Sequence, residues 1–176
     1  SGSGKSTILR LISGLEKRNK GCIEVNNEIY VNKNTFIPAE KRKIGMVFQD
    51  YALFPHLTVE KNIAFGLTKM SKINVEKRVM EMLELVGLKD KATKYPHELS
   101  GGEQQRIALA RSIAPGPKLL LLDEPFSNLD ASIKSRIRNE LYQIIKKSNI
   151  TAIFVTHDKE DAYAISDQII DIKKSI

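Results

Sequence analysis

The chain has 176 residues, of which 41% are hydrophobic and 28% are charged. This length fits a single domain with a sizeable core, and the composition excludes a disordered or collagen-like chain. No apolar run approaches the roughly 20 residues of a membrane-spanning helix. The formal net charge of +7 suits phosphate-bearing ligands, nucleic acid or an anionic membrane face. The single cysteine, Cys22, excludes an internal disulfide and agrees with a reducing compartment.

The chain opens on a Gly-rich loop, Ser1–Thr7, and apolar residues at helical spacing follow it directly. Loop followed by helix is the order that a phosphate site needs. Because the sequence starts on this loop with no strand leading into it, we interpret the chain as a fragment of a longer domain.

Two short alternating runs come next, Cys22–Val25 and Glu28–Val31, and Asn26 with Asn27 predicts a hairpin turn between them. A strand is expected at Ile44–Gln49. Residues 57–114 then show helical patterning, which predicts a helical insert in the fold.

The last third of the chain alternates strands with helices. Leu119–Leu122 is apolar without alternation, as expected of a parallel strand buried on both faces. A helix then leads to a strand at Thr151–Thr156, a short helix near Lys159–Ala164 and a final strand at Gln168–Ile172. This order predicts an α/β fold with a mainly parallel sheet.

The opening loop matches the end of a phosphate-binding motif. Gly4-Lys5-Ser6 supplies the last three positions of the P-loop pattern G-x-x-x-x-G-K-[ST]. In that pattern backbone N–H groups surround phosphates, Lys5 reaches the β- and γ-phosphates, and Ser6 binds Mg²⁺. The alternative is a flexible Gly/Ser terminus. The candidate nucleotide-binding residues here are Ser1, Gly2, Ser3, Gly4, Lys5, Ser6 and Thr7.

Two acids stand at the end of the apolar strand. Asp123 is the candidate ligand of Mg²⁺, and Glu124 is the candidate base that deprotonates a water for attack on the γ-phosphate. The alternative is a pair of solvated acids at a strand end.

A second Gly-rich segment, Leu99–Arg106, distinguishes one class of P-loop protein from the others. Ser100-Gly101-Gly102 directly precedes a helix and predicts another phosphate-facing loop. A plain capping box, formed by Ser100 and Glu103, fits these residues equally well. The combination of motifs decides between them. With these residues the sequence resembles the nucleotide-binding subunits of ATP-binding cassette (ABC) transporters, whose signature reads L-S-G-G-x-Q-x-x-R.

The resemblance covers essentially the whole chain, because the motifs of the family occur in its order. It implies a P-loop NTPase fold in which residues 1–176 form a partial ABC ATP-binding domain and residues 57–114 form the helical subdomain. The matching segments are the P-loop at Ser1–Thr7, the Q-loop glutamine Gln49, the signature at Leu99–Arg106, the Walker B strand and base at Leu119–Glu124, the D-loop at Ser127–Asp130 and the switch histidine His157.

The resemblance also implies roles and partners for these residues. ATP and Mg²⁺ would be the ligands, Gln49 would touch the metal or the attacking water, and His157 would contact the γ-phosphate and hold the base. Two subunits would pair head to tail, most simply as a homodimer. Across that interface Asp130 and the signature would meet the ATP of the partner, with the signature contributing Ser100, Gly101, Gly102 and Gln104.

A finer likeness lies in Tyr51–Leu67, which is similar to importer subunits for ferric iron, sulfate, molybdate, polyamines or sugars. It implies ATP-driven solute import at the cytoplasmic face of the cell membrane, with transmembrane permease subunits and, indirectly, a solute-binding protein as partners. Residues 50–95 would receive the permease in an apolar groove that includes Leu53, Phe54 and Phe65. The alternative is that these side chains only pack the insert.

Two other functions compete with import. ABC-type ATPases that act on DNA share the P-loop and signature, but we find neither heptads nor a basic groove interleaved with aromatic residues, and we expect no nucleic-acid partner. The chain could also be a catalytically silent fragment, because it lacks the first half of the P-loop motif.

Overall fold

The structure, a computed structural model, describes residues 4–17, 20–127, 129 and 131–172. Its helices are α1 (Lys5–Ser13), α2 (Val59–Ala64), α3 (Lys72–Leu85), α4 (Gly101–Ile113), α5 (Ala131–Ser148) and α6 (Lys159–Ile165), with short 3₁₀ turns at Ala39–Lys41, Lys89–Lys91 and Pro96–Glu98. Its strands are β1 (Ile23–Val25), β2 (Glu28–Val31), β3 (Ile44–Val47), β4 (Leu119–Asp123) and β5 (Ala152–Val155). Together they form the predicted α/β fold.

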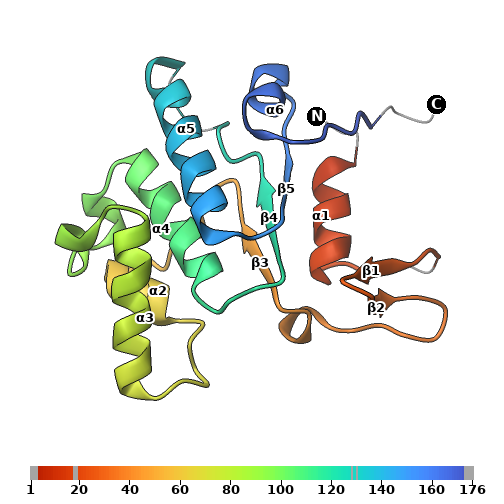
Figure 1. The fold of residues 1–176 in the computed structure, drawn as a ribbon, viewed down its shortest axis with the longest axis horizontal. Coiled ribbons are helices and arrows are strands. Elements are labelled where there is room, and N and C mark those ends of the chain that lie inside the picture. Colours follow the sequence, from red (N-terminus) through yellow and green to blue (C-terminus); the bar gives the residue numbers. More distant parts are fainter. Residues whose placement is uncertain (1–3, 18–19, 128, 130, 173–176) are drawn as a thin grey trace.

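A parallel sheet in the order β3-β4-β5 forms the centre of the described fold. The central strand β4 is buried along its whole length. Its alternate residues serve two cores: Leu119 and Leu121 pack with Leu9 of α1, whereas Leu120 and Leu122 belong to the larger core shared with α4 and α5. Figure 1 shows α1 on one side of the sheet and α4 with α5 on the other. The prediction of a parallel strand buried on both faces is confirmed.

The hairpin of β1 and β2 is also confirmed. The two strands pair antiparallel, and both residues of the turn adopt left-handed backbone angles, with φ of 51° at Asn26 and 63° at Asn27. Asparagine tolerates this conformation better than most residues, and two successive positive φ angles match the right-handed twist of the flanking strands.

Three helices, α2, α3 and α4, pack together on the side of the sheet away from α1 (Figure 1). Their apolar faces share one core, to which α4 contributes the fully buried Ile107 and Leu109. The residue bounds of 57 and 114 for a separate helical subdomain stay a prediction.

The strand predicted at Gln168–Ile172 is wrong. Residues 166–172 follow α6 without strand structure, and Ile170 is 84% exposed. A short apolar run forms a strand only where a sheet edge and a core face receive it, and this segment meets neither within the described chain.

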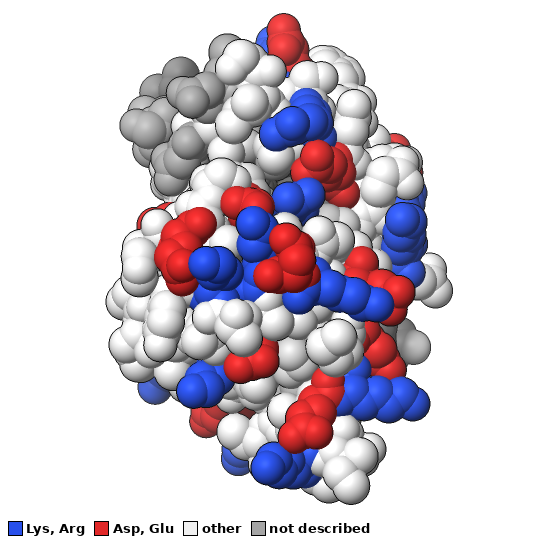
Figure 2. All heavy atoms as spheres, turned by 90° about the vertical axis from the view of Figure 1, so that its left-hand side faces the viewer, with Lys and Arg blue, Asp and Glu red and all other residues white. Residues whose placement is uncertain are grey.

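The charged side chains of both signs are mixed on the surface. Figure 2 shows Lys and Arg side chains interspersed with Asp and Glu on the face at the left of Figure 1. Among the described residues, no helix combines the length and the apolar character that crossing a bilayer requires.

Candidate functional site

The candidate residues converge at the carboxyl edge of the parallel sheet. Gln49 follows β3, Asp123 ends β4 and Glu124 comes next, and His157 lies two residues beyond the end of β5. In parallel α/β sheets ligands bind at this edge. Residues far apart in the sequence thus come together because their strands run in the same direction.

The N-terminus of α1 lies at the same edge. Gly4 caps the helix with a left-handed φ of 78°, and Lys5, Ser6 and Thr7 form its first turn. Ser6 Oγ donates a hydrogen bond of 2.8 Å to Asp123 Oδ1. The Ser6 hydroxyl and the Asp123 carboxylate therefore lie at the positive end of the helix dipole. An anion and the metal ion bound to it can be held at such a place. Ser1, Gly2 and Ser3 lie outside the described residues.

Glu124 adopts a strained backbone conformation. Its φ is 45°, in the left-handed region that residues other than Gly and Asn rarely adopt. Two neighbours hold it there: Glu124 N donates to Val155 O at 3.0 Å, and Ser127 Oγ donates to Glu124 O at 2.9 Å.

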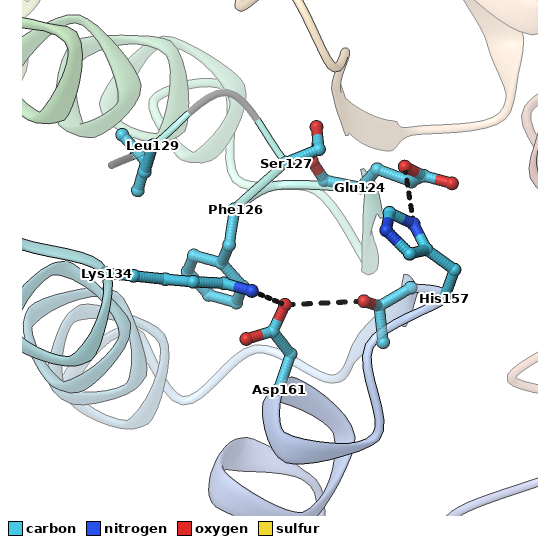
Figure 3. A pocket seen from close by; sticks show the side chains of 8 residues that line it. Glu124, Phe126, Ser127, Leu129, Lys134, His157 and Asp161 are labelled. Carbon is cyan, nitrogen blue, oxygen red and sulfur yellow. Dashed lines mark hydrogen bonds and ion pairs between the residues drawn. The ribbon is translucent and has the colours of Figure 1, made fainter. Parts of the chain in front are cut away.

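Glu124 and His157 form a direct pair, with 3.0 Å between Glu124 Oε2 and His157 Nδ1. They lie on the wall of a pocket of about 200 Å³, where Figure 3 shows the imidazole facing the carboxylate. The His157 side chain is 61% exposed, against 22% for Glu124. The pair is therefore accessible to water and to a ligand. The pocket is lined by Glu124, Phe126, Ser127, Leu129, Lys134, Thr156, His157 and Asp161.

The signature segment forms the N-terminus of α4. Ser100 caps the helix in a complete capping box, and its Oγ also donates to Glu103 Oε2 at 2.8 Å. The hydrogen bond from Ser100 N, followed by the one from its hydroxyl, lowers the pKa of the Glu103 carboxyl. Gln104 Nε2 donates to Leu99 O at 3.1 Å. The capping alternative is thus realised in the structure, while Ser100 and Gly101 remain exposed at the surface.

Gly102 has a packing role that the motif does not reveal. It is buried, and a Cβ built on it would lie 2.5 Å from Ile137 Cδ1 of α5, whereas one on Gly101 would approach only Leu129 Cδ2 at 3.8 Å. The helix α4 packs closely on α5 because this position lacks a side chain.

The segment after Gln49 is held by side chains that sequence reasoning missed. Tyr51 and Ala52 have left-handed φ angles of 61° and 47°, and Arg111 of α4 donates to their carbonyl oxygens at 3.0 and 2.7 Å. The buried Asn62 of α2 exchanges two hydrogen bonds with the backbone of Phe54. No short-range pattern in the sequence marks these contacts, because their partners lie 8 to 60 residues apart.

The apolar residues proposed for the permease groove are partly exposed. The rings of Phe54 and Phe65 lie with centroids 4.2 Å apart, and Phe65 is 56% exposed. Leu53 is partly buried against the main core. In the D-loop, Ser127 and Leu129 line the pocket, whereas Asn128 and Asp130 lie outside the described residues.

The donor set at Ser6 and Asp123 fits Mg²⁺. This ion prefers oxygen ligands and is commonly bound through one or two carboxylates together with substrate phosphates. The structure brings one hydroxyl and one carboxylate to hydrogen-bonding distance beside a helix N-terminus, and the Gln49 side chain can supply a further oxygen. Within the described ranges no three or more His, Cys, Asp or Glu side chains are grouped to hold a metal ion by themselves.

The chain is similar in sequence to proteins of a known family. The family model described as "ABC transporter" matches residues 1–127. The chain is 47% identical, over its whole length, to the spermidine/putrescine import ATP-binding protein PotA of Vibrio vulnificus. Over 97% of its length it is 49% identical to the Fe(3+) ions import ATP-binding protein FbpC 2 of Rhizobium meliloti.

Among solved structures, the chain is similar to the dimeric post-hydrolysis state of the ATP-binding cassette MJ0796 bound to ADP and phosphate. The TM-score is 0.74 with 34% identity over 93% of this chain and 74% of that one. The chain spans 46% of the PotA sequence and 42% of the FbpC 2 sequence, so it corresponds to less than half of each of these relatives.

Proposed function

The chain belongs to the ABC transporter family, and on that premise we propose that it hydrolyses ATP to drive solute import as part of a transporter's nucleotide-binding subunit. The observation that carries the proposal is the convergence of the Ser6–Asp123 and Glu124–His157 pairs at one edge of the sheet. One pair has the chemistry to hold a metal-bound phosphate, and the other has the chemistry to activate water.

The reaction follows from these groups. Amide N–H groups at the start of α1 and Lys5 bind the β- and γ-phosphates of ATP. A water molecule attacks the γ-phosphorus in line, Glu124 accepts its proton, and the bond to the bridging oxygen breaks to leave ADP and phosphate. His157, 3.0 Å from Glu124 Oε2, orients that carboxylate toward the water, while Gln49, which follows β3, would supply a polar amide.

Ser6 and Asp123 are the residues that would hold Mg²⁺, with Gln49 as a further oxygen donor. When bound, the ion would supply positive charge that offsets the charge developing on the phosphate oxygens.

We further propose that a second copy of the chain completes each site. Ser100 and Gly101 are exposed at the positive end of α4, where they can contact the γ-phosphate bound by a partner's P-loop. In this arrangement Gly102 supports the loop from within, and Gln104 and Asp130 lie at the interface. The solved dimer of a similar ATP-binding cassette supports this view.

The import direction and the location rest on the relatives. Proteins named for import of polyamines and of ferric iron are about equally similar to this chain, so we propose import at the cytoplasmic face of the membrane without choosing a solute. The exposed Phe65 and its neighbour Phe54 would face the permease subunits.

The test is the substitution Glu124→Gln in the whole protein that carries this chain. Glutamine keeps the size of the side chain but accepts no proton, so phosphate release should fall at least about a hundredfold. ATP-dependent dimerisation, measured by size-exclusion chromatography, should persist because the phosphate contacts remain.

Glu76→Gln, an exposed position on α3, is the matched control and should leave both measurements unchanged. Hydrolysis at the wild-type rate by the Glu124→Gln protein would falsify the assignment of Glu124 as the base.

A further inference from the structure

A cluster of ion pairs joins α5 to α6 and to the loop that carries His157. Lys134 and Arg138 of α5 face Asp161 of α6, with 3.0 Å from Lys134 Nζ to Asp161 Oδ2 and 2.6 Å from Arg138 to Asp161 Oδ1. Lys134 Nζ also binds Asp158. Figure 3 shows Lys134 and Asp161 pointing toward each other beside the Glu124–His157 pair.

The cluster holds the backbone on both sides of the histidine. Thr156 Oγ1 donates to Asp161 Oδ2 at 3.4 Å and accepts a hydrogen bond from Asp158 N at 3.0 Å. Asp158, which follows His157, also caps α6 by accepting from Glu160 N at 2.8 Å. Both immediate neighbours of His157 are therefore tied to side chains that Lys134 contacts.

The imidazole itself contacts the carboxylate of Glu124. The His157 side chain is 61% exposed, so packing does not restrain it. The cluster is more buried than the histidine, with side-chain exposures of 30% for Asp158, 20% for Lys134, 12% for Arg138 and 3% for Asp161. Such buried ion pairs add little net stability, because removing the charges from water offsets their attraction. They do restrict geometry, since each hydrogen bond sets a direction.

We propose that Lys134 is a positioning residue, which fixes the loop on both sides of His157 and so keeps the imidazole within hydrogen-bonding distance of Glu124. The inference rests on the proposed function, because it concerns the geometry of the hydrolytic pair. Lys134 lines the same pocket as Glu124 and His157, but it forms its ion pairs with Asp158 and Asp161, so we assign its effect to the position of His157. Lys134 lies in the first turn of α5.

The first experiment compares Lys134→Met with Lys159→Met in the whole protein. Methionine keeps the length of the side chain without its charge, and Lys159 is an exposed lysine two residues from His157. We expect Lys134→Met to lower kcat for ATP hydrolysis about tenfold while the KM for ATP changes less than about twofold. Lys159→Met should change neither. An unchanged kcat in the Lys134→Met protein would overturn the inference.

The second experiment repeats the substitution in a His157→Ala background. If Lys134 acts only through the histidine, the further loss should be less than about twofold, which is the non-additivity expected of residues that act as a unit. A general structural defect would instead give the same tenfold loss in both backgrounds, and that result would also overturn the inference.

A third measurement requires no turnover. In the whole protein the ¹⁵N and ¹³C chemical shifts of the His157 ring can be assigned by comparison with His157→Ala. We expect Lys134→Met to shift these resonances and Lys159→Met to leave them in place. Unchanged shifts contradict the positioning role. If the unmodified protein fails to hydrolyse ATP, the proposed function fails, whereas this measurement still decides the role of Lys134.

Discussion

Ser6 Oγ and Asp123 Oδ1 lie 2.8 Å apart, although 117 residues separate them in the sequence. The contact joins the first turn of α1 to the end of β4 and so links this helix to the central strand.

The Ser6–Asp123 contact predicts how metal affinity depends on the hydroxyl. Ser6→Ala removes one oxygen donor while Asp123 stays in place, so the Mg²⁺ concentration needed for half-maximal ATP binding should rise about tenfold. ATP binding without metal should change little. Titration of Mg²⁺ at fixed ATP measures the effect, and Ser135→Ala, at an exposed position on α5, serves as the control. If Ser6→Ala and Ser135→Ala need the same Mg²⁺ concentration, the assignment of Ser6 as a metal ligand is contradicted.

The two signature glycines should differ sharply in their effect on stability. A Cβ at Gly102 would lie 2.5 Å from Ile137 Cδ1, and Ile137 is itself buried, so Gly102→Ala should lower the free energy of unfolding by about 1–3 kcal/mol. Gly101→Ala meets only an ordinary contact and should be neutral or slightly stabilising. Urea unfolding measures both values.

The clash at Gly102 can be tested at its partner. Ile137→Val deletes Cδ1, the atom that the new methyl group would meet, and should recover part of the stability lost in Gly102→Ala. A double variant that is no more stable than the sum of the single losses predicts would show that the clash is not the cause.

Buried Arg42 connects α1 to the region of the hairpin. Its guanidinium donates to the carbonyl oxygens of Leu11, Ile12 and Ile37 at 2.6–2.8 Å, and the side chain is fully buried. Arg42→Met leaves the carbonyl groups of Ile12 and Ile37 without this donor, while Leu11 O keeps its hydrogen bond from Gly14 N, and should destabilise the protein by about 3 kcal/mol. Urea unfolding of this variant should be compared with Arg10→Met, an exposed arginine on α1, which we expect to lose less than about 1 kcal/mol.

Acid stability should depend on Asp158. The hydrogen bond from Lys134, ahead of the backbone hydrogen bond at Glu160, holds the pKa of this carboxyl below its ordinary value of 3.8. A carboxyl with a lowered pKa in the folded state stabilises the fold above its unfolded pKa and loses that contribution as the pH falls through the folded pKa. The contribution is therefore present above about pH 4 and disappears below it.

Asp158→Asn should reduce the steepness with which the free energy of unfolding falls below about pH 4. Denaturation by urea at a series of pH values from about 6 down to about 2 measures this slope. Glu160→Gln, an exposed neighbour on α6, provides the comparison. Parallel stability curves for Asp158→Asn and the parent protein would contradict the prediction.

Local patterns predicted the parts of the fold that local chemistry determines. The apolar run Leu119–Leu122 predicted a strand buried on both faces, and Asn26 with Asn27 predicted the hairpin turn; both are present. The segment Gln168–Ile172 was mispredicted because a short apolar run is a local signal, whereas forming a strand requires a neighbour in the sheet.

The sequence predicted only those residues of the candidate site that belong to a recognisable motif. Ser6, Asp123, Glu124 and His157 could be singled out because each belongs to an ordered set of motifs. Lys134 and Arg111 could not, since each acts on a partner 24 or more residues away and each reads as an ordinary basic residue on a helix. Long-range pairing of this kind is set by how helices pack, which spacing along the chain does not encode.

The left-handed backbone of Glu124 has a consequence for how the protein can change over time. Holding such a conformation in a residue other than glycine costs of the order of 1–3 kcal/mol, and the φ of 45° places Glu124 in it. A glycine at this position would relieve the strain, so selection for thermal robustness alone would favour losing the carboxylate. A glutamate at this position therefore lowers folding stability, and a variant selected for thermal stability without an activity screen would be expected to lose it early.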